Sequence, residues 1–263
     1  MIAAHRIKAF LLRHAYEIRS SLDRKADVIF YPAIDILIFG FLSVYVDQLG
    51  TAGKFAGGIL GALILWTLVY NIARDIAFCL LEDTWSRNLY NLYSTPLKIS
   101  EIVIGTLILS IMKAMITVSL LIVIAYGLFH FNFFSAGAVM IFYVFSVFVF
   151  GWSFGFATSA LILRFGQKVQ SVSWSLMLVL YPISGVFYPL AILPKWLAVV
   201  AKAFPLAHIF EGMRQLILRG QIPGPGDFVT IIVLDIVYLT LGILLFVAGF
   251  RHAKNRGWFI HPS

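Results

Sequence analysis

Three ionisable residues lie inside long apolar stretches of this sequence: Asp35, Lys113 and Asp235. A charge in hydrocarbon costs at least about 2.5 kcal/mol, so such residues usually pair or face water. At about 1.5 Å per residue, Lys113 lies roughly 16 Å from one membrane edge, Asp35 about 10 Å and Asp235 about 20 Å. Either aspartate can therefore meet the lysine. A proton or ion relay is one interpretation, but we favour a structural ion pair, because one pair provides no chain of carriers.

Other catalytic chemistry has no signature here. A phosphate-binding loop ends in Gly-Lys-Ser/Thr, whereas the sole Gly-Lys, Gly53-Lys54, precedes Phe55 and lacks the upstream glycine. The six histidines never fall at metal-ligand spacing, and the single cysteine, Cys79, excludes an intrachain disulfide. No Gly-x-Ser-x-Gly elbow occurs, although a Ser/His/Asp site built from distant residues would leave no such pattern. We expect no metal, no cofactor and no ATP hydrolysis in this chain.

The composition is that of a membrane protein. Hydrophobic residues make up 61% of the 263 residues and charged residues 12%, about half of the roughly 25% found in soluble domains. So few charges cannot coat a soluble globule of this size. A soluble enzyme, a secreted disulfide scaffold and a disordered chain are excluded.

Six apolar windows are long enough to cross a membrane, which takes about 20 helical residues. They are apolar on every face, unlike the alternating strands of a β-barrel. Pro182 and Gly185 interrupt the fifth window. We predict a single all-α transmembrane domain over residues 1–263 with six spans, at 28–46, 55–73, 102–129, 133–163, 169–188 and 228–250.

Basic residues indicate the orientation of these spans. Lysines and arginines are concentrated before the first span, after the second and fourth spans and in the tail 251–263, and fewer lie in the alternate segments. The positive-inside rule then places both termini in the cytoplasm, with the chain in the cell (inner or plasma) membrane.

The segment 1–27 predicts an amphipathic helix. An apolar stripe recurs at three- and four-residue spacing. Such a helix would lie at the inner headgroup layer with its stripe in the membrane; the alternative is a solvated lead-in helix. The stripe consists of Ile7, Leu11, Ala15, Ile18 and Leu22.

The longest predicted cytoplasmic connection, 74–101, contains a second amphipathic pattern. Leu81, Trp85, Leu89 and Leu92 or Tyr93 form its apolar stripe, with polar residues around it. Pro96 ends the helix because it lacks the amide hydrogen and restricts the residue before it. Such a helix can transmit force to a cytoplasmic partner, and an interfacial helix without a partner is the alternative.

Prolines divide the segment 189–227 into apolar pieces too short to cross a membrane. We predict two short amphipathic helices, 193–204 and 207–218, forming a hairpin on the outer side that dips back into the membrane. Trp196 suits the headgroup boundary, and Glu211 with Arg214 is spaced for an i, i+3 pair. The prolines expected to shape this hairpin are Pro189, Pro194 and Pro205.

Two glycine pairs permit close helix contact: Gly57-x-x-x-Gly61 and Gly151-x-x-x-Gly155. Glycine is common in transmembrane helices, so these pairs are weak markers of a dimer.

Two stretches, in this order within a six-span chain, carry a family resemblance. The first is Glu82-Asp83 followed by Arg87 to Leu97 with its Thr95-Pro96; the second comprises residues 184–190, 193–197, 204–206 and 211–214. With them the chain resembles the permease subunit of type-2 ABC exporters, which include drug, lipo-oligosaccharide and polysaccharide exporters. Asn88 and Phe204 depart from the family's usual glycine and asparagine. Residues 21–30 lack the basic-aromatic run of polysaccharide exporters, which places the drug or lipo-oligosaccharide branch ahead.

The resemblance implies a function and partners. Two permease subunits, identical or different, would pair around a path for an amphipathic or lipid-linked substrate. Two cytoplasmic ABC ATP-binding subunits would supply ATP and Mg, and nucleic acid would have no role. The residues implied in ATPase coupling are Leu81, Glu82, Asp83, Trp85, Arg87, Leu89, Leu92, Thr95, Pro96 and Leu97.

Three other functions are compatible with a chain of several membrane spans. A proton-coupled secondary transporter would use Asp35, Lys113 and Asp235 and would normally show internal repeats, of which none is convincing. A lipid-modifying membrane enzyme needs clustered catalytic groups, which do not stand out. The third is a non-transporting membrane protein associated with an ABC ATPase.

Overall fold

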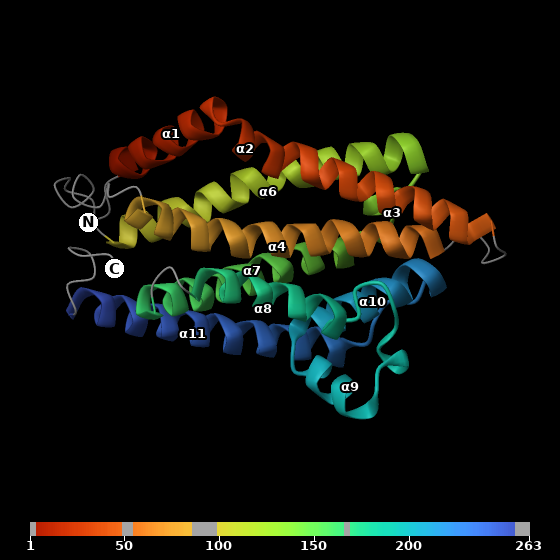
Figure 1. Cartoon of the computed structure of the whole chain (residues 1–263). Coiled ribbons are helices and arrows are strands. Elements are labelled where there is room, and N and C mark those ends of the chain that lie inside the picture. The colour runs from red at the N-terminus through yellow and green to blue at the C-terminus, as the bar shows by residue number, and fades with distance from the viewer. Residues whose placement is uncertain (1–3, 49–54, 86–98, 166–168, 256–263) are drawn as a thin grey trace.

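A computed structural model of the chain describes residues 4–48, 55–85, 99–165 and 169–255. In these ranges every regular element is a helix and none is a strand, which confirms the predicted all-α fold. The long helices run side by side, with the start of α1 and the end of α11 at one end of the bundle (Figure 1). We call this the terminal end, and the opposite end, which carries α9 and α10, the hairpin end.

Five helical segments of the described chain are long and apolar enough to cross a membrane. The predicted windows 28–46, 55–73, 102–129 and 228–250 each lie within one of them. The window 133–163 instead begins with a 3-10 turn, Phe133–Ala136, which ends at Gly137 with a φ of +63°. The five segments are α3 (Tyr31–Gln48) with the π-helical turn Ala26–Phe30 before it, α4 (Phe55–Trp85), α6 (Ile99–Phe129), α7 (Ala138–Phe165) and α11 (Pro225–Asn255).

The interrupted window takes a different form. Its helix, α8 (Gln170–Ile183), has 14 residues, or about 21 Å, short of the roughly 30 Å of hydrocarbon. Residues 184–188 are turn and bend rather than helix. Helix α8 leads from the terminal end towards the hairpin end (Figure 1). Its role as a membrane span stays a prediction.

Short helices lie at both ends of the bundle. At the terminal end, α1 (Ala4–Ser20) is followed by α2 (Leu22–Lys25). At the hairpin end, α9 (Lys195–Lys202) and α10 (Pro205–Arg219) meet at an angle of 99°. The two helices lie where the sequence predicts them. Pro205 is the first residue of α10, and Gly220 ends it in the left-handed conformation, the usual proline-first and glycine-last arrangement.

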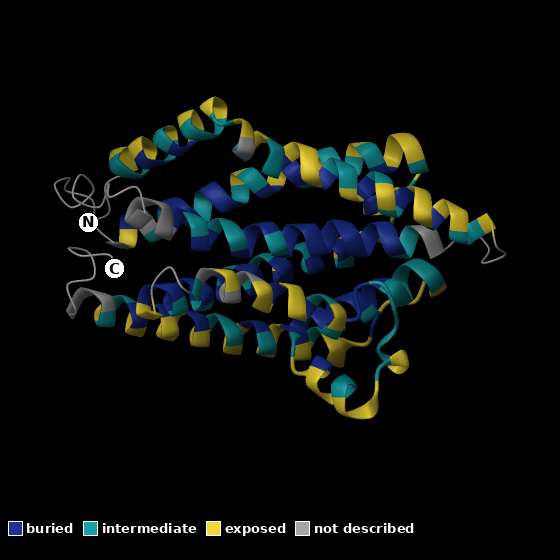
Figure 2. Ribbon diagram, in the orientation of Figure 1, coloured by how far each residue is buried: buried dark blue, intermediate teal, exposed yellow. Residues whose placement is uncertain are grey.

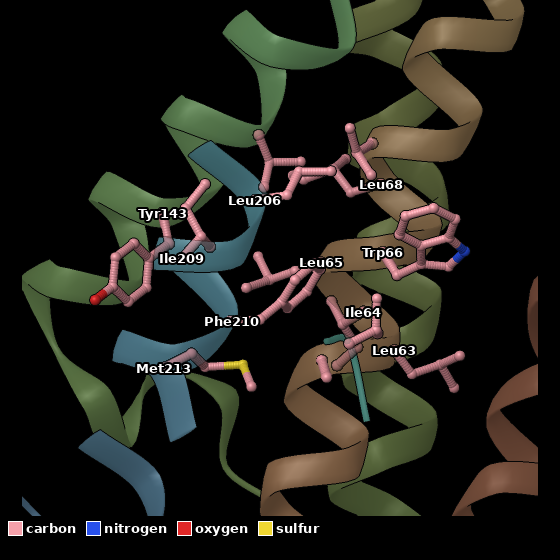
Figure 3. Packing of buried hydrophobic residues seen from close by; sticks show 14 of the residues in the cluster. Leu63, Ile64, Leu65, Trp66, Leu68, Tyr143, Leu206, Ile209, Phe210 and Met213 are labelled. Atoms are coloured by element: carbon pink, nitrogen blue, oxygen red, sulfur yellow. The ribbon is translucent and has the colours of Figure 1, made fainter. Parts of the chain in front are cut away.

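Helix α4 forms the centre of the bundle. In an 18-residue stretch of its span 83% of the residues are buried, against 22% in such a stretch of α11, and Figure 2 shows this contrast. Its apolar residues, Leu65 and Leu68 among them, form one cluster with Tyr143 of α7 and with α10 (Figure 3). The outer helices expose apolar side chains such as Phe41 and Ile236. An apolar centre with an apolar exterior is the arrangement expected in lipid.

The paired glycines serve helix packing within the chain. A Cβ on Gly155 of α7 would come within 2.9 Å of the Ala73 carbonyl oxygen of α4, and one on Gly151 within 2.9 Å of Ile72. A Cβ on Gly61 would meet Met213 and Ile217 of α10. Both pairs therefore already have partners inside one subunit.

Candidate functional site

Arg214 on α10 holds the loop that follows α8. Its Nη1 donates to Glu211 Oε2 at 2.8 Å, which confirms the predicted i, i+3 pair. Its Nη2 donates to the Gly185 carbonyl at 2.5 Å and to the Val186 carbonyl at 3.3 Å. The Arg214 side chain is 12% exposed. One mostly buried cation therefore joins a carboxylate on its own helix to two loop carbonyls.

The same loop has further supports. Glu211 Oε2 accepts a hydrogen bond from the Leu190 backbone N–H at 3.4 Å. Gly185 has a φ of +62°, and a Cβ there would come within 2.9 Å of the Tyr188 carbonyl oxygen, so glycine is required on both counts. We call Gly185, Val186, Leu190, Glu211 and Arg214 the Arg214 lock. The sequence predicted its ion pair but not the loop carbonyls.

The other predicted hairpin residues lie in or next to the short helices at this end of the bundle. Pro189 precedes the 3-10 turn Leu190–Ile192, Pro194 precedes α9, and Pro205 begins α10. Trp196 on α9 is 70% exposed. An exposed indole on a short helix outside the spans is typical of a membrane boundary.

At the terminal end, residues 81–97, which we call the coupling segment, begin as a continuation of α4. Leu81, Glu82, Asp83 and Trp85 belong to the last turns of this helix. The helix has no break between its apolar span and Trp85, so the span and the start of the coupling segment form one 31-residue helix. The other coupling residues lie outside the described part of the chain: Arg87, Leu89, Leu92, Thr95, Pro96 and Leu97.

Helix α1 is docked on α6 and α4. Arg6 pairs with the fully buried Glu101 at 3.6 Å. Phe10 covers Gly105, where a Cβ would come within 2.6 Å of the ring. His14 lies 3.5 Å through Nε2 from the Sγ of Cys79 on α4. These contacts do not fit a solvated lead-in helix.

The buried face of α1 differs from the predicted stripe. Phe10 and His14 are buried, whereas Ala15 and Leu22 of the stripe are exposed. Leu11 and Ile18 pack at the edge of the Phe10 cluster. The face of α1 that packs on its neighbours thus centres on Phe10 and His14, beside the predicted stripe, and periodicity alone does not reveal this face. The position of α1 in the membrane stays a prediction.

The intramembrane lysine pairs with an aspartate, Asp75, that lies outside the predicted spans. Lys113 Nζ of α6 lies 2.9 Å from Asp75 Oδ1 of α4, and the two side chains are 17% and 13% exposed. The expectation that Asp35 or Asp235 would be its partner is wrong. The predicted span ended at Ala73, whereas the apolar helix continues to Cys79 and includes Asp75.

The other two charged residues lie apart from this pair. Asp35 is exposed on α3. Asp235 of α11 is 7% exposed. The Ser146 hydroxyl donates to its Oδ2 at 2.5 Å, and Oδ1 has no hydrogen-bond partner among the described residues. Across the ranges that the structure describes, no three His, Cys, Asp or Glu side chains are grouped so that they could bind a metal ion.

Replacing Lys113 with methionine is expected to lower the amount of folded protein, because Asp75 is left without its cation. Removing one partner of a buried pair costs about 3 to 5 kcal/mol. The double variant Lys113→Met, Asp75→Asn should recover most of the loss, since neither charge remains. Size-exclusion chromatography of the detergent-extracted single and double variants measures this, and purely additive losses would contradict the pairing.

A comparison with protein-family models matches residues 18–218 to the ABC-2 type transporter domain. The match covers about three quarters of the chain and includes the coupling segment, the Lys113–Asp75 pair and the Arg214 lock. A comparison with curated protein sequences finds no match. With five helices fit to cross a membrane, this match shows that the chain is a membrane permease and belongs to the ABC-2 type transporter family.

Proposed function

We propose that the chain is the membrane-spanning subunit of an ATP-driven exporter. It moves an amphipathic or lipid-linked substrate outward, such as a drug-like molecule, a lipid, a lipo-oligosaccharide or a polysaccharide. A cytoplasmic ABC ATP-binding subunit holds ATP and Mg, and a second permease subunit, identical or different, completes the path.

The continuity of α4 carries this proposal. The helix contains the start of the coupling segment, and its buried centre packs on α10 (Figure 3). Helix α10 carries Arg214, which holds the loop after α8. A displacement of the coupling segment is therefore transmitted through α4 to α10 at the hairpin end. ATP shifts the complex between two states only to the extent that it binds one state more tightly than the other.

The coupling segment can be tested with two charge substitutions. The double variant Leu89→Asp, Leu92→Asp places carboxylates on the apolar stripe and is expected to abolish co-purification with the ATP-binding subunit. Asn88→Asp with Asn91→Asp is the matched control, because it adds the same charge to the polar positions of the same segment. An undiminished yield of the complex with Leu89→Asp, Leu92→Asp would refute the coupling assignment.

The proton-coupled alternative has lost part of its basis. Lys113 is bound to Asp75, so it does not link Asp35 to Asp235. Transport in proteoliposomes distinguishes the two mechanisms: an ATP-driven exporter stops without nucleotide and survives collapse of the proton gradient, whereas a proton-coupled carrier does the reverse.

A further inference from the structure

Helices α6 and α7 leave an apolar groove between them. Although they are consecutive in the chain, α6 packs mainly on α4, whereas α7 packs on α11 and α4, and the two hardly pack on each other. The resulting groove has a volume of about 280 Å³, near the lower end of the roughly 300 to 1,000 Å³ of small-molecule sites. We propose that this groove binds one acyl chain of a membrane lipid.

The lining of the groove fits a hydrocarbon chain. Met115 and Ser119 of α6 form one wall, Ile141 and Phe148 of α7 the other, and Leu68 of α4 the floor. Leu68 is buried, whereas Met115 and Ile141 are each 63% exposed. Ser119 is one of few polar groups, so the groove offers almost nothing to a polar ligand. The groove is therefore backed by buried Leu68 and opens on the outer surface of the bundle, where Met115 and Ile141 are exposed.

The position of the groove matches one leaflet. Phe134, in the connection between α6 and α7, lines the groove on the side nearer the hairpin end. From there the groove follows α7 from Ile141 to Phe148, about 10 Å of helix. It therefore lies within the half of the roughly 30 Å hydrocarbon layer nearer the hairpin end.

The size of the groove excludes a helix as its occupant. A helix with its side chains is about 10 Å wide, too large for a cavity of 280 Å³. A second subunit laid over the mouth would leave a void, and the lining would lose its dispersion contacts. A flexible acyl chain can fill the space, and the bilayer supplies it whatever substrate is transported.

Photolabelling tests the proposal on the full chain. The protein is reconstituted with a phosphatidylcholine that carries a diazirine in one acyl chain, and the labelled residues are mapped by mass spectrometry. We expect more label in the groove than on equally exposed positions of α11 such as Val233 and Ile236, which are 52% and 60% exposed. Equal labelling per exposed residue would mean ordinary lipid contact, and weaker labelling would mean a protein-covered face; either result would overturn the proposal.

A variant that fills the groove gives a second test. Ser119→Phe is expected to reduce groove labelling about tenfold, because displacing even two methylene groups costs roughly that factor in affinity. Val123→Phe is the matched control: Val123 lies one turn further along α6, is 68% exposed and does not line the groove. Unchanged labelling in folded Ser119→Phe would refute the site, and the wild-type comparison decides the question if that variant fails to fold.

Discussion

Replacing Arg214 with methionine is expected to abolish transport while the chain still inserts into the membrane. The change removes the donor that serves the Gly185 and Val186 carbonyls and leaves Glu211 without its cation. Lost hydrogen bonds from a charged donor cost about 3 kcal/mol in total, which lowers the population of the held loop about a hundredfold. Substrate transport in proteoliposomes with the ATP-binding subunit measures the effect.

Two control variants isolate the lock from the loss of charge. Arg219→Met removes a cation from the last turn of the same helix, where the side chain is exposed, and should transport normally. Arg214→Lys keeps the charge, but a single ammonium group cannot donate to two carbonyls and a carboxylate in the way that the planar guanidinium does. Partial activity is therefore expected. Wild-type transport by folded Arg214→Met would show that the lock has no role in the transport cycle.

Replacing Gly242 of α11 with leucine is expected to destabilise the whole bundle. A Cβ there would come within 2.4 Å of the Ser153 carbonyl oxygen in the α7 backbone, so the two helices must separate. Overpacking of this kind costs about 3 kcal/mol, and a protein of this size would lose about 8 °C in melting temperature. Thermal unfolding of the detergent-purified protein measures the shift.

The control for this packing effect is Gly127→Leu on α6. No atom lies within 4 Å of a Cβ at Gly127, and leucine is the better helix former. This variant should melt at or slightly above the wild-type temperature. Equal melting temperatures for both leucine variants would contradict the close contact between α7 and α11.

Several parts of the candidate site were predictable because they depend on local spacing. Glu211 and Arg214 are three residues apart on one helix, so their pairing followed from helical geometry. Pro205 and the short apolar pieces around it predicted α9 and α10. By contrast, the carbonyls of Gly185 and Val186 are separated from Arg214 by 29 and 28 positions, and no local pattern connects them.

The partner of Lys113 illustrates the same limit. The three charges inside apolar windows predict an ion pair, but Asp75 follows Arg74 and lies outside the predicted span 55–73. The next turn of α4 is still apolar and packed on its neighbours, so the helix carries Asp75 into the bundle opposite Lys113. The bounds of the apolar helices along the chain were predictable to within a few residues, whereas the rotation of each helix about its axis was not.

Length and apolar composition are enough to show that this chain is a helical membrane protein, and its motifs indicate the ABC-2 type transporter family. Helices in lipid must satisfy their backbone hydrogen bonds within each segment, so length and apolarity are sufficient to identify them. The packing of the helices was needed to show which helix is central, which face of α1 is buried, how the glycines pack and where α6 and α7 separate. In windows that are apolar on every face, no polarity pattern specifies the neighbour, and contact is decided by the close fit of side chains and glycines.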